Sequence, residues 1–170
     1  MNAALSIRKV EKRDEPYLAA IIRAVFEEHN APKKGTVYSD PTTDYLYDLF
    51  ENADSILWVA EWNQQLVGCC GVYPTEGLPI KTAELVKFYI SPHARGFGIG
   101  KQLIKKSIAS AKEMGYEKLY LESMPQFSKA VDFYNRLGFK SLEKAMGSSM
   151  ACISAVQLHQ RVGGMAKTTK

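Results

Sequence analysis

Two kinds of hydrophobic spacing alternate along this chain of 170 residues. Strict alternation with polar residues, or a short continuous apolar run, predicts strands, whereas recurrence every three to four residues predicts amphipathic helices. Clusters of turn-forming residues separate these segments. Strands are expected at 5–10, 55–62, 66–74, 82–92, 117–125, 139–143 and 150–162. Helices are expected at 13–29, 42–53, 98–114 and 127–138.

The ends of the expected helices carry capping signals. Asp14 is predicted to be the N-cap of the first helix and Ser128 the N-cap of the last. Gly115 and Gly138 stand where glycines commonly end a helix. Residues 29–43, HNAPKKGTVYSDPTT, are rich in turn-forming residues and predict an irregular loop.

The expected order of elements is a strand, two helices, three strands, a helix, a strand, a helix and two strands. This order is typical of a mixed α/β (α+β) domain in which helices cover both faces of one sheet. A chain of this length most simply forms one domain, which we place at residues 1–162. Residues 163–170, GGMAKTTK, are expected to be a frayed tail.

Composition and charge exclude several classes of function. Apolar residues make up 46% and charged residues 24% of the chain, which is the ordinary balance of a soluble domain. The net charge of +4 is scattered, so no nucleic-acid partner is expected. No segment has the pattern of a signal peptide or of a membrane span, so we predict a cytoplasmic protein without a membrane partner.

The cysteines and histidines do not form a metal-binding pattern. Cys69 and Cys70 are adjacent in an apolar segment and Cys152 stands alone, which predicts reduced, buried thiols. The histidines share no spacing typical of metal ligands, so no metal is expected. They are His29, His93 and His159.

The segment RGFGIGKQ, residues 95–102, places three glycines at alternate positions between an expected strand and an expected helix. A Walker A loop is excluded because Arg95 and Gln102 occupy positions that require Gly and Ser or Thr. A dinucleotide-binding fingerprint is excluded because Lys101 occupies the place of its third glycine. An R-x-x-G-x-G loop remains, in which backbone N–H groups at a helix start bind a pyrophosphate. A glycine-rich turn without a ligand is the structural alternative.

This loop and a second motif, KAVDFYNRLGF at residues 129–139, together resemble the GNAT superfamily of N-acetyltransferases over most of the chain. The strand end KFYISP before the loop is also similar to that family. The resemblance implies a mostly antiparallel sheet with a splayed central strand pair, and acetyl-CoA as co-substrate. The loop would bind the pyrophosphate, and the preceding strand would pair with the pantetheine arm. The residues implied in cofactor binding are Phe88, Tyr89, Ile90, Arg95, Gly96, Phe97, Gly98, Ile99, Gly100 and Lys101.

Two details of the cofactor site stay open. Lys101, Lys105 and Lys106 follow the loop, and either one of them faces the 3′-phosphate of the cofactor or all three form a solvated helix face. Many members of the family have an asparagine, touching pantetheine, where this chain has Phe127. No cofactor contact is therefore assigned at that position.

Acetyl transfer to an amine requires removal of the amine's proton and protonation of the departing thiolate. Glu84, six residues before Ile90, matches the position of a glutamate base in several family members. Glu122 on the neighbouring strand is the second candidate. Tyr134 matches the position of the acid, with a packed core tyrosine as the alternative. No Cys or Ser stands in a nucleophile context, which favours direct attack in a ternary complex.

The expected function is N-acetylation of a primary amine of a small molecule. One alternative is a protein lysine or N-terminus as acceptor, and another is a non-catalytic acyl-CoA-binding module. For a small-molecule acceptor, the 29–46 loop and the 143–150 turn would form the walls of a pocket. For a peptide acceptor, the same two segments would have to be low, so that a groove stays open. Lys33 and Lys34 either favour an acidic acceptor or form a solvated pair. A homodimer is compatible with all of these interpretations.

Overall fold

The computed structural model describes residues 4–143, 146 and 156–161. The strands are β1 Leu5–Lys9, β2 Ile56–Trp62, β3 Gln65–Tyr73, β4 Thr82–Ile90, β5 Lys118–Ser123, β6 Lys140–Leu142 and β7 Val156–Arg161. The α-helices are α1 Glu15–Glu28, α2 Leu46–Leu49, α3 Ile99–Glu113 and α4 Ser128–Arg136. Short 3-10 turns lie at Lys12–Asp14, Pro41–Asp44, Pro92–Ala94 and Pro125–Phe127. This order confirms the predicted sequence of elements.

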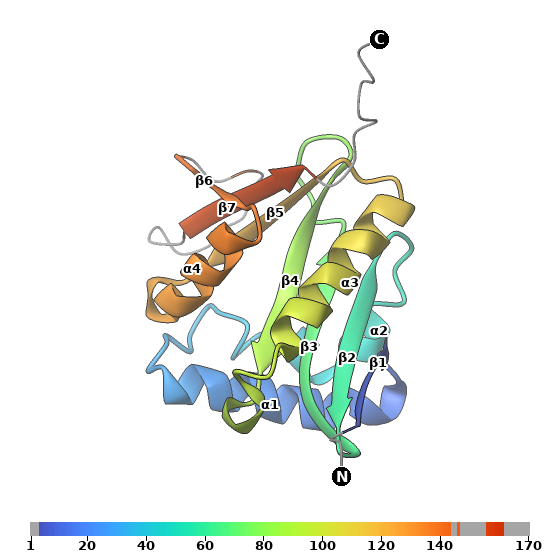
Figure 1. Ribbon diagram of the computed structural model, residues 1–170, viewed down its shortest axis with the longest axis vertical. Coiled ribbons are helices and arrows are strands. Elements are labelled where there is room, and N and C mark those ends of the chain that lie inside the picture. Colours follow the sequence, from blue (N-terminus) through green and yellow to red (C-terminus); the bar gives the residue numbers. More distant parts are fainter. Residues whose placement is uncertain (1–3, 144–145, 147–155, 162–170) are drawn as a thin grey trace.

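The described strands form one seven-stranded sheet in the order β1-β2-β3-β4-β5-β7-β6. Every neighbouring pair is antiparallel except β4 and β5, which run parallel. These two strands pair only where Thr82–Glu84 meets Lys118–Tyr120, and beyond that point they diverge (Figure 1). The expected mixed, mostly antiparallel sheet with a splayed central pair is therefore confirmed.

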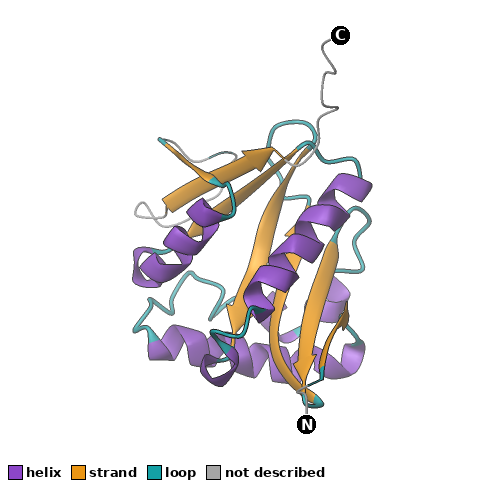
Figure 2. Ribbon diagram, viewed as in Figure 1, coloured by secondary structure: helices purple, strands orange, loops and turns teal. Residues whose placement is uncertain are grey.

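Helices cover both faces of the sheet (Figure 2). The alternation in β2 shows why, because Leu57 and Val59 are buried in one core cluster and Trp58 packs against the other. The first cluster joins this face to α1 and includes Leu18, Ile22 and Phe26. The second cluster joins the opposite face to α3 and α4 and includes Leu103, Ile104, Leu119, Leu121 and Tyr134.

The helix ends confirm some capping predictions and correct others. Gly115, with a φ of 91°, follows the last turn of α3 as expected. Ser128 is not a cap, because it is the first helical residue of α4 and Phe127 occupies the N-cap position. Asp14 does occupy the N-cap position of α1, but its side chain makes no capping hydrogen bond. Its carboxylate instead accepts hydrogen bonds of 2.8 and 2.9 Å from Arg8.

The segment between α1 and β2 is less helical than predicted. The helix expected at 42–53 is reduced to the 3-10 turn Pro41–Asp44 and the single turn of α2. Tyr45 separates the two with a φ of −131°, which is outside the helical range. A chain of short turns therefore replaces one continuous helix.

Cys69 and Cys70 are free, buried thiols, as expected. Burial raises the pKa of both, that of Cys70 to about 12, so neither is a nucleophile at neutral pH. Cys152, the tail at 163–170 and most of the 143–150 turn lie outside the described residues.

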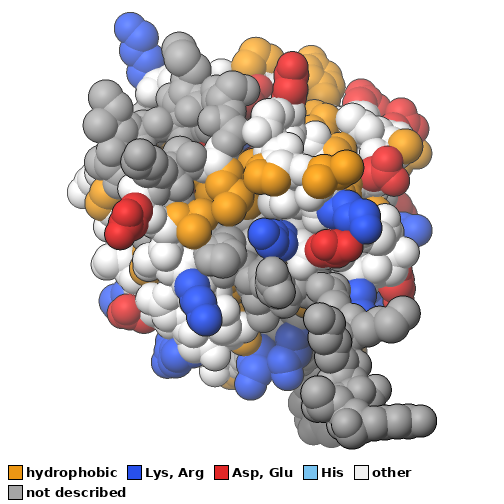
Figure 3. Space-filling view, turned by 90° about the horizontal axis from the view of Figure 1, so that it is seen from above, with side chains coloured by type: hydrophobic (Ala, Val, Ile, Leu, Met, Phe, Trp, Pro, Cys, Tyr) orange, Lys and Arg blue, Asp and Glu red, His pale blue; other side chains and the backbone are white. Residues whose placement is uncertain are grey.

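Within the described residues, no three or more side chains are grouped as a metal would require, and no helix combines the length and hydropathy needed to cross a membrane. Side chains of both charges, with hydrophobic ones between them, share the face seen from above in Figure 3.

Candidate active site

The turn before α3 depends on two glycines in the left-handed region. Gly96 and Gly98 have φ values of 82° and 78°, and Gly98 is the N-cap residue of α3. A Cβ atom added at either position would have no heavy atom within 4 Å, so the space in front of this turn is open. An open helix start that presents backbone N–H groups is suited to bind an anion such as a pyrophosphate.

Gly100, the third glycine, serves a different structural purpose. A Cβ atom at this position would lie 3.0 Å from Cζ of Phe88 in β4. This distance is tighter than ordinary van der Waals contact, so glycine here lets α3 approach β4 closely. Ile99 beside it is 2% exposed and belongs to the core.

Arg95 connects the loop to α1 and β4. Its guanidinium donates hydrogen bonds of 2.7 and 2.9 Å to the carboxylate of Glu28, the last residue of α1. Its Nε donates to the carbonyl of Ile90 at 3.1 Å. The hydrogen bonds from Arg95 lower the pKa of Glu28. The Arg95 side chain therefore holds the loop in place from the side of α1.

Phe97 is an exposed large hydrophobic residue of the loop. Its side chain is 62% exposed, and its ring centroid lies 4.7 Å from that of Trp62 at the end of β2. Lys101, Lys105 and Lys106 follow in α3, and the Lys106 ammonium lies 4.5 Å from the centroid of the Trp58 ring. This contact places Lys106 over β2 and away from β4.

Two carboxylates meet where β4 and β5 separate. Glu84 is the last residue of β4 in register with β5, opposite Tyr120. Thr75 Oγ1 donates a hydrogen bond of 2.5 Å to Glu84 Oε2, and the Tyr120 hydroxyl donates one of 2.6 Å to Glu122 Oε1. The structure thus brings both predicted base candidates to this fork. Tyr120 was not identified from the sequence, although its hydrogen-bond partner Glu122 lies on the same strand.

The environment of Glu84 makes its carboxylate more basic than usual. Burial raises the pKa of Glu84, and the nearby charge of Glu122 acts in the same direction. The hydrogen bond from Thr75 opposes this shift without cancelling it. A carboxylate whose pKa is moved towards neutrality is a better proton acceptor at physiological pH.

Tyr134 is buried at 7% exposure among aromatic side chains. Its ring centroid lies 5.9 Å from that of Phe88 in β4 and 5.9 Å from that of Phe139. Burial raises its pKa well above the ordinary value of 10.0, so the phenol keeps its proton at neutral pH. A protonated phenol is the form that the predicted acid requires, and the same side chain also packs as a core tyrosine.

Phe127, the position at which the resemblance implies asparagine in many members, lies in an aromatic cluster. Its ring packs at 5.5 Å from that of Phe26 and at 5.1 Å from that of His29, measured between centroids. Phe26 also contacts the rings of Tyr38 and Tyr89, at 6.1 and 6.0 Å. An aromatic wall of these five residues joins α1, the loop after it, β4 and the turn before α4.

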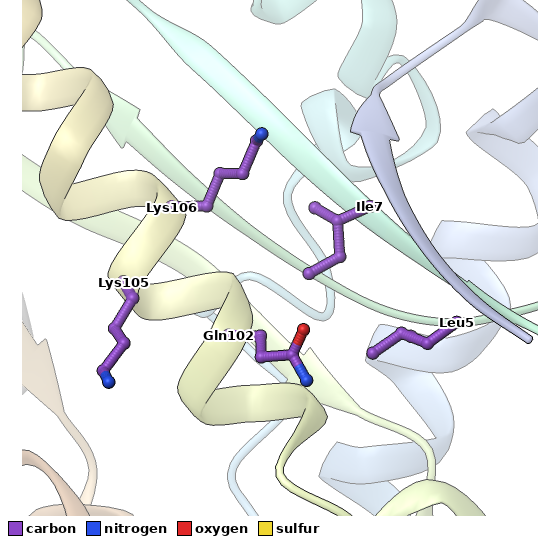
Figure 4. Close-up of a pocket in the computed structure, with 5 residues that line it drawn as sticks. All are labelled: Leu5, Ile7, Gln102, Lys105 and Lys106. Carbon is purple, nitrogen blue, oxygen red and sulfur yellow. The ribbon is translucent and has the colours of Figure 1, made fainter.

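A cavity of about 460 Å³ lies elsewhere, between β1 and α3. Leu5, Ile7, Gln102, Lys105 and Lys106 line it, and Figure 4 shows Gln102 pointing towards β1 while Lys105 points away. It is on the β1 side of α3, away from β5, and it contains none of the predicted catalytic residues.

Comparison with known sequences identifies similar proteins. The family model described as the acetyltransferase (GNAT) family matches residues 22–139. An uncharacterised N-acetyltransferase of Escherichia coli, YjgM, is 33% identical over 142 residues, which cover 83% of this chain and 85% of that protein. Human N-acetyltransferase 8 is 30% identical over 128 residues, covering 73% of this chain and 53% of that protein. The chain thus spans most of the bacterial relative and about half of the human one.

Solved structures share the fold. A GNAT-family acetyltransferase from Staphylococcus aureus superposes with a TM-score of 0.82 at 23% identity, covering 94% of this chain and all of that one. The yncA protein of Salmonella typhimurium, solved with acetyl-CoA, superposes with a TM-score of 0.77 at 17% identity, covering 96% of each chain. The splayed strand pair therefore belongs to a fold that has been seen with acetyl-CoA bound.

Proposed function

The chain belongs to the acetyltransferase (GNAT) family and is an acetyl-CoA-dependent acetyltransferase, and we propose that it acetylates a primary amine of a small molecule by direct attack. The observation that carries this proposal is the position of Glu84. This buried carboxylate stands at the last paired residue of β4, where the strands open, with its pKa raised.

Glu84 is proposed to accept the proton of the attacking amine, directly or through a water molecule. An alkyl amine with a pKa near 10.4 is unprotonated in only about one molecule in 2,500 at pH 7. A positioned base removes this limitation and typically contributes about 100- to 10,000-fold in rate. Glu122, held by Tyr120 on the other side of the fork, is the second candidate for the same role.

Tyr134 is proposed to protonate the departing thiolate. Its raised pKa keeps the hydroxyl protonated, and its contact with Phe88 places it beside the strand expected to pair with pantetheine. The open turn at Gly96 and Gly98 would hold the pyrophosphate, and its backbone N–H groups supply the positive end of α3.

A firmly held loop after α1 supports a small acceptor. The Arg23 guanidinium donates hydrogen bonds of 2.6 and 2.9 Å to Asp44, and Arg23 Nε donates one of 3.2 Å to the carbonyl of Tyr38. The Tyr38 hydroxyl donates to Glu27 at 2.7 Å. We take this anchored loop to be a wall of the site, whereas a peptide groove would require this side to be low.

The acceptor class is tested by measuring CoA release with acetyl-CoA and a panel of amines, amino acids and short lysine or N-terminal peptides. Small amines are expected to be acetylated and the peptides to react at least 10-fold more slowly. Faster reaction with the peptides would favour a protein acceptor. Binding of acetyl-CoA without any CoA release would favour the non-catalytic module.

The base is tested with Glu84→Gln, which keeps the shape and the hydrogen bond from Thr75 but removes basicity. We expect kcat/KM to fall about 100-fold or more at pH 7 and to recover as the pH approaches the pKa of the amine. Glu122→Gln is the matched control and should show the smaller effect. The roles exchange if only Glu122→Gln shows the defect that high pH relieves, and a pH-independent loss in both variants would argue against either base.

A further inference from the structure

Lys87 has an unusual backbone conformation in the middle of β4. Its φ of 55° is in the left-handed region, which is unfavourable for a lysine. Cys69 pairs with Tyr89 and Gly71 with Val86, so two residues of β4, Lys87 and Phe88, stand opposite the single residue between Cys69 and Gly71. This is a β-bulge, a device that redirects side chains and is common beside active sites.

The bulge determines which side of the sheet Lys87 occupies. Leu85 packs in the cluster under α3, and strict alternation would place residue 87 on that same side. Phe88 and Ile90 pack there instead, so the side-chain alternation is reset at the bulge. Val86 and Tyr89 pack on the α1 side of β4, and the charge of Asp40 in the loop after α1 acts on Lys87, which assigns Lys87 to that side too.

The surroundings of Lys87 carry negative charge but no ion-pair partner. The described charges that act on it are those of Asp40, in the loop after α1, and of Glu84 at the fork. Among the described residues, none forms an ion pair within 4.0 Å or a hydrogen bond with its ammonium, although Arg8, Lys12, Arg23, Lys81 and Arg95 all have such partners. Burial lowers the pKa of Lys87, and the nearby charges oppose this shift without cancelling it.

We propose that Lys87 binds a carboxylate of the acceptor, so that the substrate is an amine that also carries a carboxylate group. This inference rests on the proposed function, because it concerns the acceptor of the same reaction. The carboxylates of Glu84 and Glu122 at the fork are complementary in charge to the ammonium of such a substrate. Lys87, three residues along the strand from Glu84, is complementary in charge to its carboxylate. A single carboxylate balances the one lysine, whereas a doubly charged phosphate would place excess negative charge beside Glu84.

The experiment compares amines as matched pairs that differ only in the carboxylate. L-leucine, L-phenylalanine, β-alanine and 4-aminobutyrate are assayed against their carboxamides, and O-phosphoethanolamine serves as the phosphate arm. The quantity compared is the acid-to-amide ratio of kcat/KM in wild type and in Lys87→Met. Since each amine appears in both proteins, differences in amine pKa cancel when the two ratios are divided.

We expect wild type to favour at least one acid over its amide, and Lys87→Met to reduce that ratio by about 10- to 100-fold, as loss of a charge-assisted hydrogen bond would. Lys87→Arg should retain most of the preference. Lys81→Met is the matched control, because Lys81 also has a positive φ of 60° but pairs with Glu117 outside the fork. Its ratio should equal that of wild type.

The acid-to-amide ratio separates substrate binding from an indirect effect. Glu84, Asp40 and Cys69 act electrostatically on Lys87, and removing the Lys87 charge would change the basicity of Glu84 and slow acids and amides equally. An equal loss for both members of each pair therefore overturns the inference and leaves the proposed function standing. A preference of the wild-type protein for the amides or for O-phosphoethanolamine would also overturn the inference and leave the proposed function standing. This result does not depend on the folding of any variant. Absence of CoA release with every amine would overturn both proposals.

Discussion

Gly98→Ala tests the open turn before α3 through two separate measurements. Backbone strain should lower the stability of the fold, and blocking of the turn should weaken the binding of CoA. Alanine at a φ of 78° is disfavoured by about 1–2 kcal/mol, partly offset because alanine also restricts the unfolded chain. The added Cβ meets no protein atom within 4 Å, so no further loss of packing is expected. A net loss of about 1 kcal/mol corresponds to a fall in Tm of about 2–4 °C for a chain of this size.

The effect on ligand binding should be larger. A methyl group in front of the helix start prevents close approach of a phosphate, and each charge-assisted hydrogen bond lost is worth about 1.5–3 kcal/mol. We therefore expect the Kd for CoA, measured by calorimetry at constant salt, to rise about 10- to 100-fold in Gly98→Ala.

Gly115→Ala provides the matched control, because Gly115 has a φ of 91° and the same open surroundings at the other end of α3. Its Tm should fall by a similar amount while the Kd for CoA stays at the wild-type value. An equal Kd in the two variants would show that the turn at Gly98 is not the phosphate site. Gly100 is unsuitable for this test, because a side chain there would crowd Phe88 inside the protein.

Two further predictions concern the proposed catalytic residues. Tyr134→Phe keeps the ring contacts and removes only the hydroxyl, so kcat should fall about 10- to 1,000-fold with little change in CoA affinity, and wild-type turnover would leave Tyr134 with a packing role alone. Glu84→Gln should be more stable than wild type near neutral pH. Burial raises the folded-state pKa of Glu84 above its ordinary value of 4.5, so the wild-type protein loses stability as the pH rises through that pKa and the glutamine variant does not. Urea unfolding at pH 4.5, 6 and 7.5 should show the advantage of the variant growing with pH, and a constant difference would contradict the assignment.

The sequence predicted the elements well where the signals are local. Alternation identified β2, β3 and β4, and helical spacing identified α1, α3 and α4, because these patterns reflect which face of an element is buried. Local signals were misleading where a residue of another element binds the side chain in question. Asp14 does not cap α1 with its side chain because its carboxylate is engaged by Arg8 from β1.

The candidate site was predicted in part. The residue types at Glu84, Glu122 and Tyr134 and the glycine loop were identified from motifs and spacing. Their environments were not, because the partners of Glu84 and Arg95 come from other elements, Thr75 for Glu84 and Glu28 for Arg95. Tyr120, the partner of Glu122 on the same strand, belongs to neither motif. Lys87 was missed altogether, since regular alternation would have assigned it to the other side of the sheet.

By itself the sequence determined the order of the strands and helices, their approximate positions except for the segment 42–53, and the positions of the glycines that the turn before α3 requires. These features follow from interactions between residues that are close along the chain. Only the tertiary structure decided that Gly100 accommodates Phe88, that Glu84 stands at the last paired position before β4 and β5 separate, and that a bulge places Lys87 beside it. Strand register and helix packing bring together residues that are far apart in sequence, and burial then changes their basicity.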